Sequence, residues 1–380
     1  MTVPVPAIRG RHSDGQRAND RVLHVVDHSS DGHCPAVLER LLNERRHDEM
    51  LPLSSGGRAG QPSWLTSARW ILGGDDGGVS ASIKRARAEG RPFSLIHGWG
   101  TRALSLVGYA EGCDGRLATI DSFLSHAPAA MQASNILRSG RVSVTFSSAR
   151  AWYSMMQLAG QATNHDDADQ LHCMAVHPDQ LSDHRQDVRN RWGVGPEAMV
   201  IGLLGDPMSE INLRALSGIP VRCRILGRDA VIVMSSSGAR RGDLIRWMER
   251  VAPGLRMVID DALDRPRGVV KAMDLVLAPA AVGRQSRICS VEPVMAAVAA
   301  GVPVMLGEDH PASEWAVEEP LIWPEASTDE HAATKWLFSR SAESMSQVHD
   351  RVIRRCDQVH DSIMASYERI LGSSKSAAAA

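Results

Sequence analysis

The sequence has few aromatic residues, a small net charge and no long apolar run, and each of these features excludes a class of protein. Aromatic residues make up only 4% of the 380 positions, which disfavours proteins that bind nucleic acid by stacking on its bases. The formal net charge of -2 gives no general attraction to nucleic acid or to an anionic membrane surface. We therefore expect no nucleic-acid partner.

The six cysteines are scattered, at positions 34, 113, 173, 223, 289 and 356. No two of them form a Cys-x-x-Cys pair, so the sequence signals neither a zinc site nor a dithiol redox site. Widely spaced thiols in a large chain are typical of a reducing compartment. The first twenty residues lack the apolar segment of an export signal, so we expect a cytoplasmic protein, with peripheral membrane contact left open.

The His- and Asp-rich stretch "NHDDADQLHCMAVHPDQ" has no recognised spacing of metal ligands, and a solvated loop is its simplest interpretation. The loop "AAVGRQSRICS" after the predicted strand "DLVLAP" has only one glycine, so it is neither a P-loop nor a dinucleotide fingerprint. We expect no bound metal and no cofactor.

A chain of 380 residues exceeds one ordinary core, so we expect two domains. The order of apolar runs predicts that both are α/β domains. Strand-like runs alternate with helical patterns over residues 21–185, and again over 186–326 after a polar, basic stretch. This alternation favours open, mostly parallel sheets. Residues 327–371 are predicted to form a long helical segment, and residues 1–20 and 372–380 to be disordered tails.

In the first unit, a polar turn follows the strand-like run at 22–26, and Pro35 then opens a helix. The N-terminus of that helix directs partial positive charge toward the sheet edge. Asp27 and Gly32 are candidates for contact with a bound molecule there, or for a role in the loop alone. His97 is predicted to end a later strand, where it would hydrogen-bond a substrate hydroxyl; the alternative is a histidine satisfied within the core.

In the second unit, a carboxylate stands in front of an apolar helix. The strand "DLVLAP" leads into a loop with Arg284, Arg287 and Ser290, and a helix begins near Glu292. Ligands of open α/β sheets bind outside the carboxyl ends of strands, where free N–H groups favour a diphosphate. Glu292 could accept hydrogen bonds from ribose, and the arginines could pair with phosphate. The alternative is a helix start favoured electrostatically and two solvated arginines.

These segments, in this order, resemble retaining glycosyltransferases with the GT-B fold, of the GT4-type group, over residues 21–325. "SVEPVMAAVAAGVPVML" is similar to the donor-site segment of that group, where Glu292 matches an acid that contacts the nucleotide ribose. "VIGLLGD", with Gly205, is similar to the entry of the donor domain. "LIHGWGTRAL" resembles a segment whose histidine, here His97, lies near the transferred sugar, and Gly32 matches the first glycine loop.

The sequence departs from this pattern at several positions. Arg284 stands where the group has a first acid, seven residues before the second. The stretch "PMSEINLRAL" directly after "GLLGD" contains no lysine, and Trp99 replaces a second histidine. A catalytically inactive GT-B module that binds a nucleotide, a glycan or a protein partner is therefore an alternative to an active enzyme.

The resemblance implies two doubly wound Rossmann-like domains facing a cleft, with an N-terminal acceptor domain, a C-terminal donor domain and a long C-terminal helix. It implies a hexosyltransferase-type enzyme that moves a sugar, with retention, from a nucleotide-diphosphate donor to the hydroxyl of a glycan, lipid or small-molecule acceptor. No metal is implied. A nucleotide-sugar epimerase of the same architecture is a second alternative.

Overall fold

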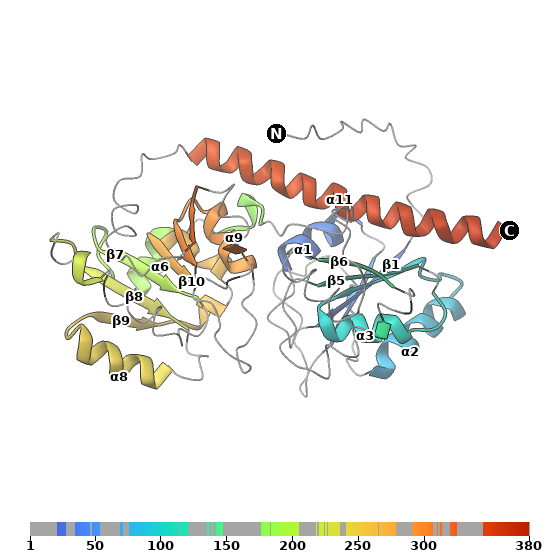
Figure 1. Cartoon of the computed structure of the whole chain (residues 1–380), viewed down its shortest axis with the longest axis horizontal. Helices are drawn as coiled ribbons and strands as arrows, with labels where there is room; N and C mark the ends of the chain where they lie inside the picture. The colour runs from blue at the N-terminus through green and yellow to red at the C-terminus, as the bar shows by residue number, and fades with distance from the viewer. Residues whose placement is uncertain are drawn as a thin grey trace.

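The computed structural model contains two α/β domains side by side, with one long helix running along both (Figure 1). The residues that it describes are 21–27, 35–45, 48–53, 69–70, 76–113, 115–120, 135–136, 139, 142–146, 176–182, 184–204, 218, 220–223, 225, 227–235, 241–264, 266–278, 291–306, 310, 312–313, 320–324 and 345–379.

The N-terminal domain is built on a six-stranded sheet in the order β3-β2-β1-β4-β5-β6, and its strand pairs are parallel. The strands are β1 (Val22–Asp27), β2 (Glu49–Leu53), β3 (Arg69–Trp70), β4 (Leu95–Trp99), β5 (Gly115–Ile120) and β6 (Ser143–Phe146).

The C-terminal domain repeats this plan, in the order β12-β11-β10-β7-β8-β9, again with parallel pairs. Its strands are β7 (Met199–Leu203), β8 (Ala230–Met234), β9 (Arg256–Ile259), β10 (Leu275–Ala278), β11 (Val304–Leu306) and β12 (Ile322–Pro324).

Helices cover the sheets and join them. The α-helices include α1 (Pro35–Glu44), α2 (Asp76–Ala88), α3 (Thr101–Tyr109), α6 (Arg185–Arg191), α8 (Arg241–Val251), α9 (Glu292–Ala299) and α11 (Met345–Ala379). Short 3-10 helices are η3 (Pro178–Gln180), η4 (Asp261–Asp264), η5 (Pro266–Gly268) and η6 (Val270–Ala272).

Numbered within its own domain, each sheet has the strand order 3-2-1-4-5-6 of a doubly wound fold. The order reverses between β1 and β4 in one domain and between β7 and β10 in the other. Ligands of such sheets bind at these switch points, outside the carboxyl ends of the strands. The helix that follows β1 in the described chain is α1, and the helix that follows β10 is α9, so both helices start at a switch point.

The central strands are buried on both faces, as parallel sheets require. Every residue of β7, β8 and β10 is buried, which explains their continuous apolar sequences "MVIGL", "AVIVM" and "LVLA". Packing explains the glycine at position 202 in β7, because a Cβ added there would collide with the Met273 sulfur.

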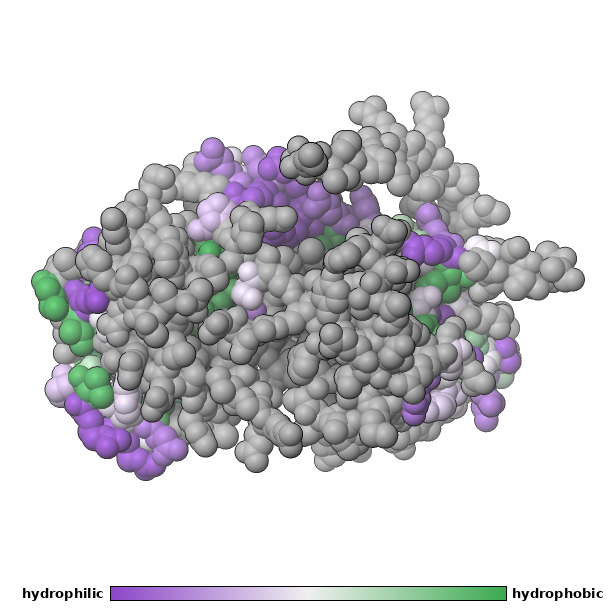
Figure 2. Space-filling model, viewed as in Figure 1, coloured by the Kyte–Doolittle hydropathy of each residue, from purple (hydrophilic) through white to green (hydrophobic). Residues whose placement is uncertain are grey.

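Helix α11 is amphipathic, and its predicted apolar positions face the protein. Val348, Val352, Val359, Ile363 and Tyr367 are all buried, and the charged residues on its opposite side give the hydrophilic band along the helix in Figure 2. Among the described residues, no helix combines the length and the apolar character that a bilayer crossing needs.

The two doubly wound domains and the long C-terminal helix confirm the fold class predicted from the sequence. One predicted boundary needs correction: residues 372–379 were expected to be disordered but continue α11. Alanine is the best helix former, and extending an existing helix requires no new nucleation. The other predicted tail, residues 1–20, lies outside the described residues.

Candidate functional site

Glu292 is the first residue of α9, and its position confirms the helix predicted to begin there. A proline in the first turn costs no hydrogen bond, because the N–H that it lacks has no partner within the helix. Only 8% of the residue surface of Glu292 is exposed. A carboxylate this buried needs hydrogen-bond or ion-pair partners, and the following contacts supply them.

The first donor comes from the other domain. The backbone N–H of Ala36, in the first turn of α1, donates to Glu292 Oε2 at 3.3 Å. This N–H is one of the four at a helix start that have no partner within the helix. The contact joins the two helices that begin at the two switch points, so the switch points of the two sheets face each other across the domain boundary.

Arg267 of η5 is a charged partner of Glu292 and forms an ion pair with it. Its Nε lies 3.4 Å from Glu292 Oε1, and its Nη1 donates to Glu39 Oε2 of α1 at 2.7 Å. The Arg267 side chain is 15% exposed and that of Glu39 is 20% exposed, so the pair is largely shielded from water. Shielded charge-assisted contacts are stronger than surface ion pairs.

The segment between the domains also holds α1. Gln180 of η3 donates through Nε2 to the carbonyl of Ala36 at 3.0 Å and lies 3.3 Å from Glu39 Oε2. Its Oε1 accepts from the backbone N–H of His177, which keeps the amide in one orientation. The start of α1 is therefore fixed by the C-terminal domain and by the connecting segment together.

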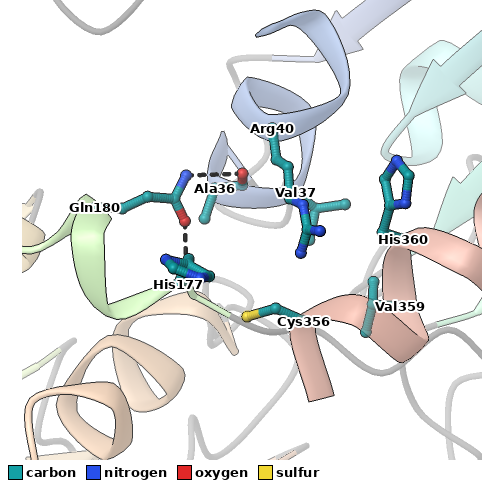
Figure 3. Close-up of a pocket in the computed structure, with 8 residues that line it drawn as sticks. All are labelled: Ala36, Val37, Arg40, His177, Gln180, Cys356, Val359 and His360. Atoms are coloured by element: carbon teal, nitrogen blue, oxygen red, sulfur yellow. Dashed lines mark hydrogen bonds between the residues drawn. The ribbon is translucent and has the colours of Figure 1, made fainter. Parts of the chain in front are cut away.

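A small pocket lies beside this contact, where α1, η3 and α11 meet (Figure 3). Its volume of about 10 Å³ is close to the minimum that holds one water molecule, so it does not accommodate a sugar. Burial raises the pKa of the Cys356 thiol in its wall to about 11, which keeps that sulfur protonated and unreactive. We assign this pocket a packing role.

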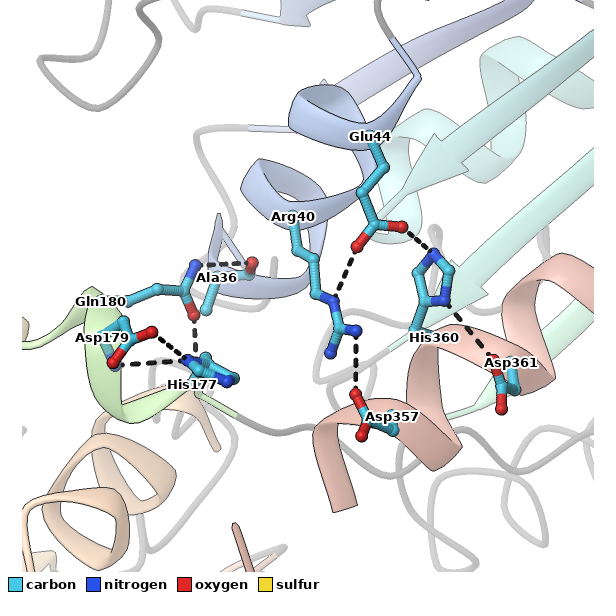
Figure 4. Close-up of polar contacts among 9 residues, drawn as sticks. All are labelled: Ala36, Arg40, Glu44, His177, Asp179, Gln180, Asp357, His360 and Asp361. Carbon is cyan, nitrogen blue, oxygen red and sulfur yellow. Dashed lines mark hydrogen bonds and ion pairs between the residues drawn. The ribbon is translucent and has the colours of Figure 1, made fainter. Parts of the chain in front are cut away.

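Ion pairs fasten α11 to the other half of α1 (Figure 4). Arg40 donates through Nε to Glu44 Oε1 at 3.0 Å and through Nη2 to Asp357 Oδ1 at 2.9 Å. His360 Nε2 lies 2.6 Å from Glu44 Oε2. Because α1 is held at both ends, its N-terminus presents a fixed set of N–H groups at the domain boundary.

His97 lies in the middle of β4, not at its end as predicted, and it is fully buried. Its Nδ1 is 2.7 Å from the Tyr367 hydroxyl and its Nε2 is 2.7 Å from Thr119 Oγ1. The Trp99 ring stacks on the imidazole, with 4.1 Å between centroids. This geometry supports the alternative interpretation, a histidine satisfied within the core, and gives no support to a catalytic role.

The other predicted site residues are mostly beyond what the structure describes. Asp27 ends β1, as predicted, and pairs in register with Leu53, but its side chain is not described. Gly32, Gly205, Arg284, Arg287 and Ser290 lie outside the described residues. Within the described part of the chain, no group of three or more His, Cys, Asp or Glu side chains is placed to hold a metal ion.

Sequence reasoning missed Arg267, Glu39 and Gln180. None of them stands in a motif, and they lie far apart in the sequence. One signal could have pointed to Arg267, since η5 lies shortly before the strand-and-helix unit that carries Glu292, with only η6 between them.

Comparison with solved structures places this architecture in the GT-B class. Anabaena HepE in complex with UDP-glucose matches at 16% identity and a TM-score of 0.60, covering 91% of this chain and 99% of that one. A glycosyltransferase from Rickettsia africae matches at 13% identity and a TM-score of 0.62, covering 93% and 99%. Sucrose-phosphate synthase from Thermosynechococcus elongatus matches at 12% identity and a TM-score of 0.62, covering 93% and 100%.

The chain thus has the GT-B fold of glycosyltransferases over nearly its whole length. No family model matches the sequence, and no curated protein matches it either.

Proposed function

We propose that the protein is a retaining, hexosyl-type glycosyltransferase of the GT4-like group, which transfers a sugar from a nucleotide-diphosphate donor to an acceptor hydroxyl. One observation carries the proposal: the buried carboxylate of Glu292 starts α9 at one switch point and meets the start of α1 at the other. Solved GT-B neighbours include HepE bound to UDP-glucose, which supports a nucleotide-sugar as the ligand.

In this proposal Glu292 accepts hydrogen bonds from the donor ribose. A carboxylate can accept up to about four hydrogen bonds, so its contacts with Ala36 and Arg267 do not exclude a hydroxyl. Free N–H groups at helix starts favour the diphosphate. Gly205, Arg284, Arg287 and Ser290 complete the donor side.

Asp27 and Gly32 face the acceptor. Catalysis rests on positioning the two substrates and on stabilising the departing diphosphate, with no metal required.

An inactive GT-B module that binds nucleotide, glycan or partner is the second candidate, and a specific observation favours it. His97, the residue proposed from the resemblance to lie near the transferred sugar, is buried in β4 with its ring nitrogens engaged by Thr119 of β5 and Tyr367 of α11. Arg284 also replaces the first acid of the donor motif. Such a protein would bind the nucleotide without transferring the sugar.

The experiment is a thermal-shift screen with UDP, GDP, ADP and their sugars, followed by a turnover assay. A ligand at 100 times its Kd stabilises the folded protein by about 2.7 kcal/mol. For a domain of this size we expect the Tm to rise by roughly 5–10 °C. The Glu292→Gln variant should bind the nucleotide about tenfold more weakly or worse, because it loses a charged hydrogen-bond acceptor. Glu249→Gln, on the exposed side of α8, is the matched control.

The outcomes separate the candidates. Transfer to an added acceptor supports the transferase, and binding without turnover supports the inactive module. Release of a free epimer without acceptor supports an epimerase. If no nucleotide or nucleotide-sugar binds, the donor-site proposal is wrong.

A further inference from the structure

The Arg267 side chain links the Glu292 carboxylate to Glu39, a charged group of the other domain. One side of its guanidinium faces Glu292 Oε1, 3.4 Å from Nε, and another N–H donates to Glu39 Oε2 of α1 at 2.7 Å. The guanidinium is planar and rigid, so a fixed contact with Glu39 also fixes the direction of its contact with Glu292.

The backbone of Arg267 is fixed as well. The N–H of Ser182, in the segment between the domains, donates to the Arg267 carbonyl at 3.1 Å. Pro266 beside it is buried within η5, and the Val269 N–H closes the turn on the Pro266 carbonyl. The side chain therefore starts from a rigid base, and little conformational freedom remains to be lost when it holds the carboxylate.

The second Glu292 oxygen accepts from the Ala36 N–H at 3.3 Å, so Arg267 and Ala36 contact different oxygens of the carboxylate. A carboxylate held on both oxygens has its plane and its remaining lone-pair directions set before a ligand arrives. Preorganisation of this kind is what makes a hydroxyl contact specific.

We propose that Arg267 is a positioning residue: it orients the Glu292 carboxylate toward the ribose hydroxyls of the nucleotide donor and ties that orientation to α1 of the N-terminal domain through Glu39. The proposal rests on the proposed function, because it assigns the ribose as the ligand of Glu292. It predicts that recognition of a ribose hydroxyl depends on a residue that itself need not touch the nucleotide.

The test compares the affinities of the full-length protein for UDP, 2′-deoxy-UDP and 3′-deoxy-UDP by isothermal titration calorimetry. The wild type should prefer UDP about tenfold or more over the analogue that lacks the hydroxyl bound by Glu292. This preference should fall to near unity in Glu292→Gln. It should fall by a similar factor in Arg267→Gln, and Arg267→Lys should not restore it, because an ammonium cannot bridge two carboxylates in a fixed plane.

Arg185→Gln is the matched control. Arg185, the first residue of α6, also pairs with a carboxylate, Asp274 at 2.6 Å, and its substitution should leave the UDP preference unchanged. Glu39→Gln provides a second variant if Arg267→Gln does not fold. It removes the anchor of the guanidinium and should lower the preference by a smaller factor than Arg267→Gln.

Three results are decisive. If Arg267→Gln and Glu39→Gln keep the wild-type preference for UDP, Arg267 has no positioning role, even though the protein binds nucleotide as proposed. If Arg267→Gln weakens UDP and both deoxy analogues by the same factor, its role is general and the inference also fails. If the wild type binds none of UDP, GDP and ADP, the proposed function itself is wrong and the inference falls with it.

Discussion

The buried hydrogen bond between Tyr367 and His97 gives a prediction, and counting the donors around it indicates which side chain donates. Thr145 Oγ1 lies 3.4 Å from the carbonyl of Ala118, which can only accept, and we assign the Thr145 proton to that contact; with this assignment Thr145 accepts from Thr119 Oγ1, 2.9 Å away. Thr119 has then used its one proton and accepts from His97 Nε2–H. The other ring nitrogen of His97 is therefore an acceptor, and the Tyr367 hydroxyl donates to it at 2.7 Å.

The acidity of Tyr367 agrees with this direction. Burial raises the pKa of the Tyr367 hydroxyl well above its usual value, and the charge of Asp48 raises it further. The phenol therefore keeps its proton at neutral pH. Because Tyr367 lies on α11 and His97 on β4, the hydrogen bond joins the C-terminal helix to the centre of the N-terminal sheet.

Tyr367→Phe removes one oxygen and the donor that His97 Nδ1 accepts from, in a site with no access to solvent. The aromatic ring, edge-on to the imidazole at 5.5 Å, is kept. Removing one partner of a buried hydrogen bond costs about 1–3 kcal/mol. At roughly 2–4 °C per kcal/mol for a domain of this size, the expected fall in Tm is about 2–12 °C.

Urea denaturation and ¹⁵N NMR of the histidine ring measure the two parts of this prediction. Tyr109→Phe is the matched control, because that hydroxyl belongs to a residue that is 62% exposed and its loss should stay within about 0.5 kcal/mol. The reasoning is refuted if Tyr367→Phe is no more destabilising than the control. It is equally refuted if the NMR spectrum shows His97 protonated at Nδ1 in the wild type.

Two further predictions concern folding stability. Burial lowers the pKa of His310 to about 3, so the imidazole stays neutral when folded but titrates near pH 6.5 when unfolded. Burying the neutral imidazole carries no cost to the free energy of unfolding above about pH 6.5, and this cost grows as the pH falls toward about 3. The free energy of unfolding at pH 5 should therefore be about 2 kcal/mol lower than at pH 8. This loss should disappear in His310→Asn, whose side-chain carbonyl can still accept from the Ala312 N–H. Urea midpoints at the two pH values measure the loss, and a variant that loses as much stability at pH 5 as the wild type would contradict the role of His310. Gly202→Ala should destabilise the protein by about 1–3 kcal/mol because the methyl group collides with Met273, whereas Gly242→Ala, in open space on α8, should stabilise it by about 0.5–1 kcal/mol; thermal unfolding of both variants checks the difference in sign.

The sequence determined the local elements and the faces that they bury. The continuous apolar runs at β7, β8 and β10 are what a fully buried parallel strand needs, and the three- and four-residue spacing along α11 places its apolar residues on one side. Proline in the first turn and a carboxylate at the start were enough to locate α9 at Glu292. Each of these features depends on residues within one or two turns of each other.

The extent of two elements was less predictable. β4 continues past His97 through Gly98 and Trp99, and α11 continues through 372–379, because strand pairing with β1 and β5 and extension of an existing helix override the local composition. Periodicity reports which face is apolar, but it does not report which neighbour will cover that face.

Only the tertiary structure decided which groups meet at the candidate site. Ala36 and Glu292 are 256 residues apart, Glu39 and Arg267 are 228 apart, and His97 and Tyr367 are 270 apart. Such pairs follow from the order of strands in each sheet and from how the two domains and α11 pack. The sequence on its own therefore determined a charged helix start beside a sheet edge. The packing of the two domains determined that this carboxylate is held across their boundary, because no local pattern encodes a contact between distant segments.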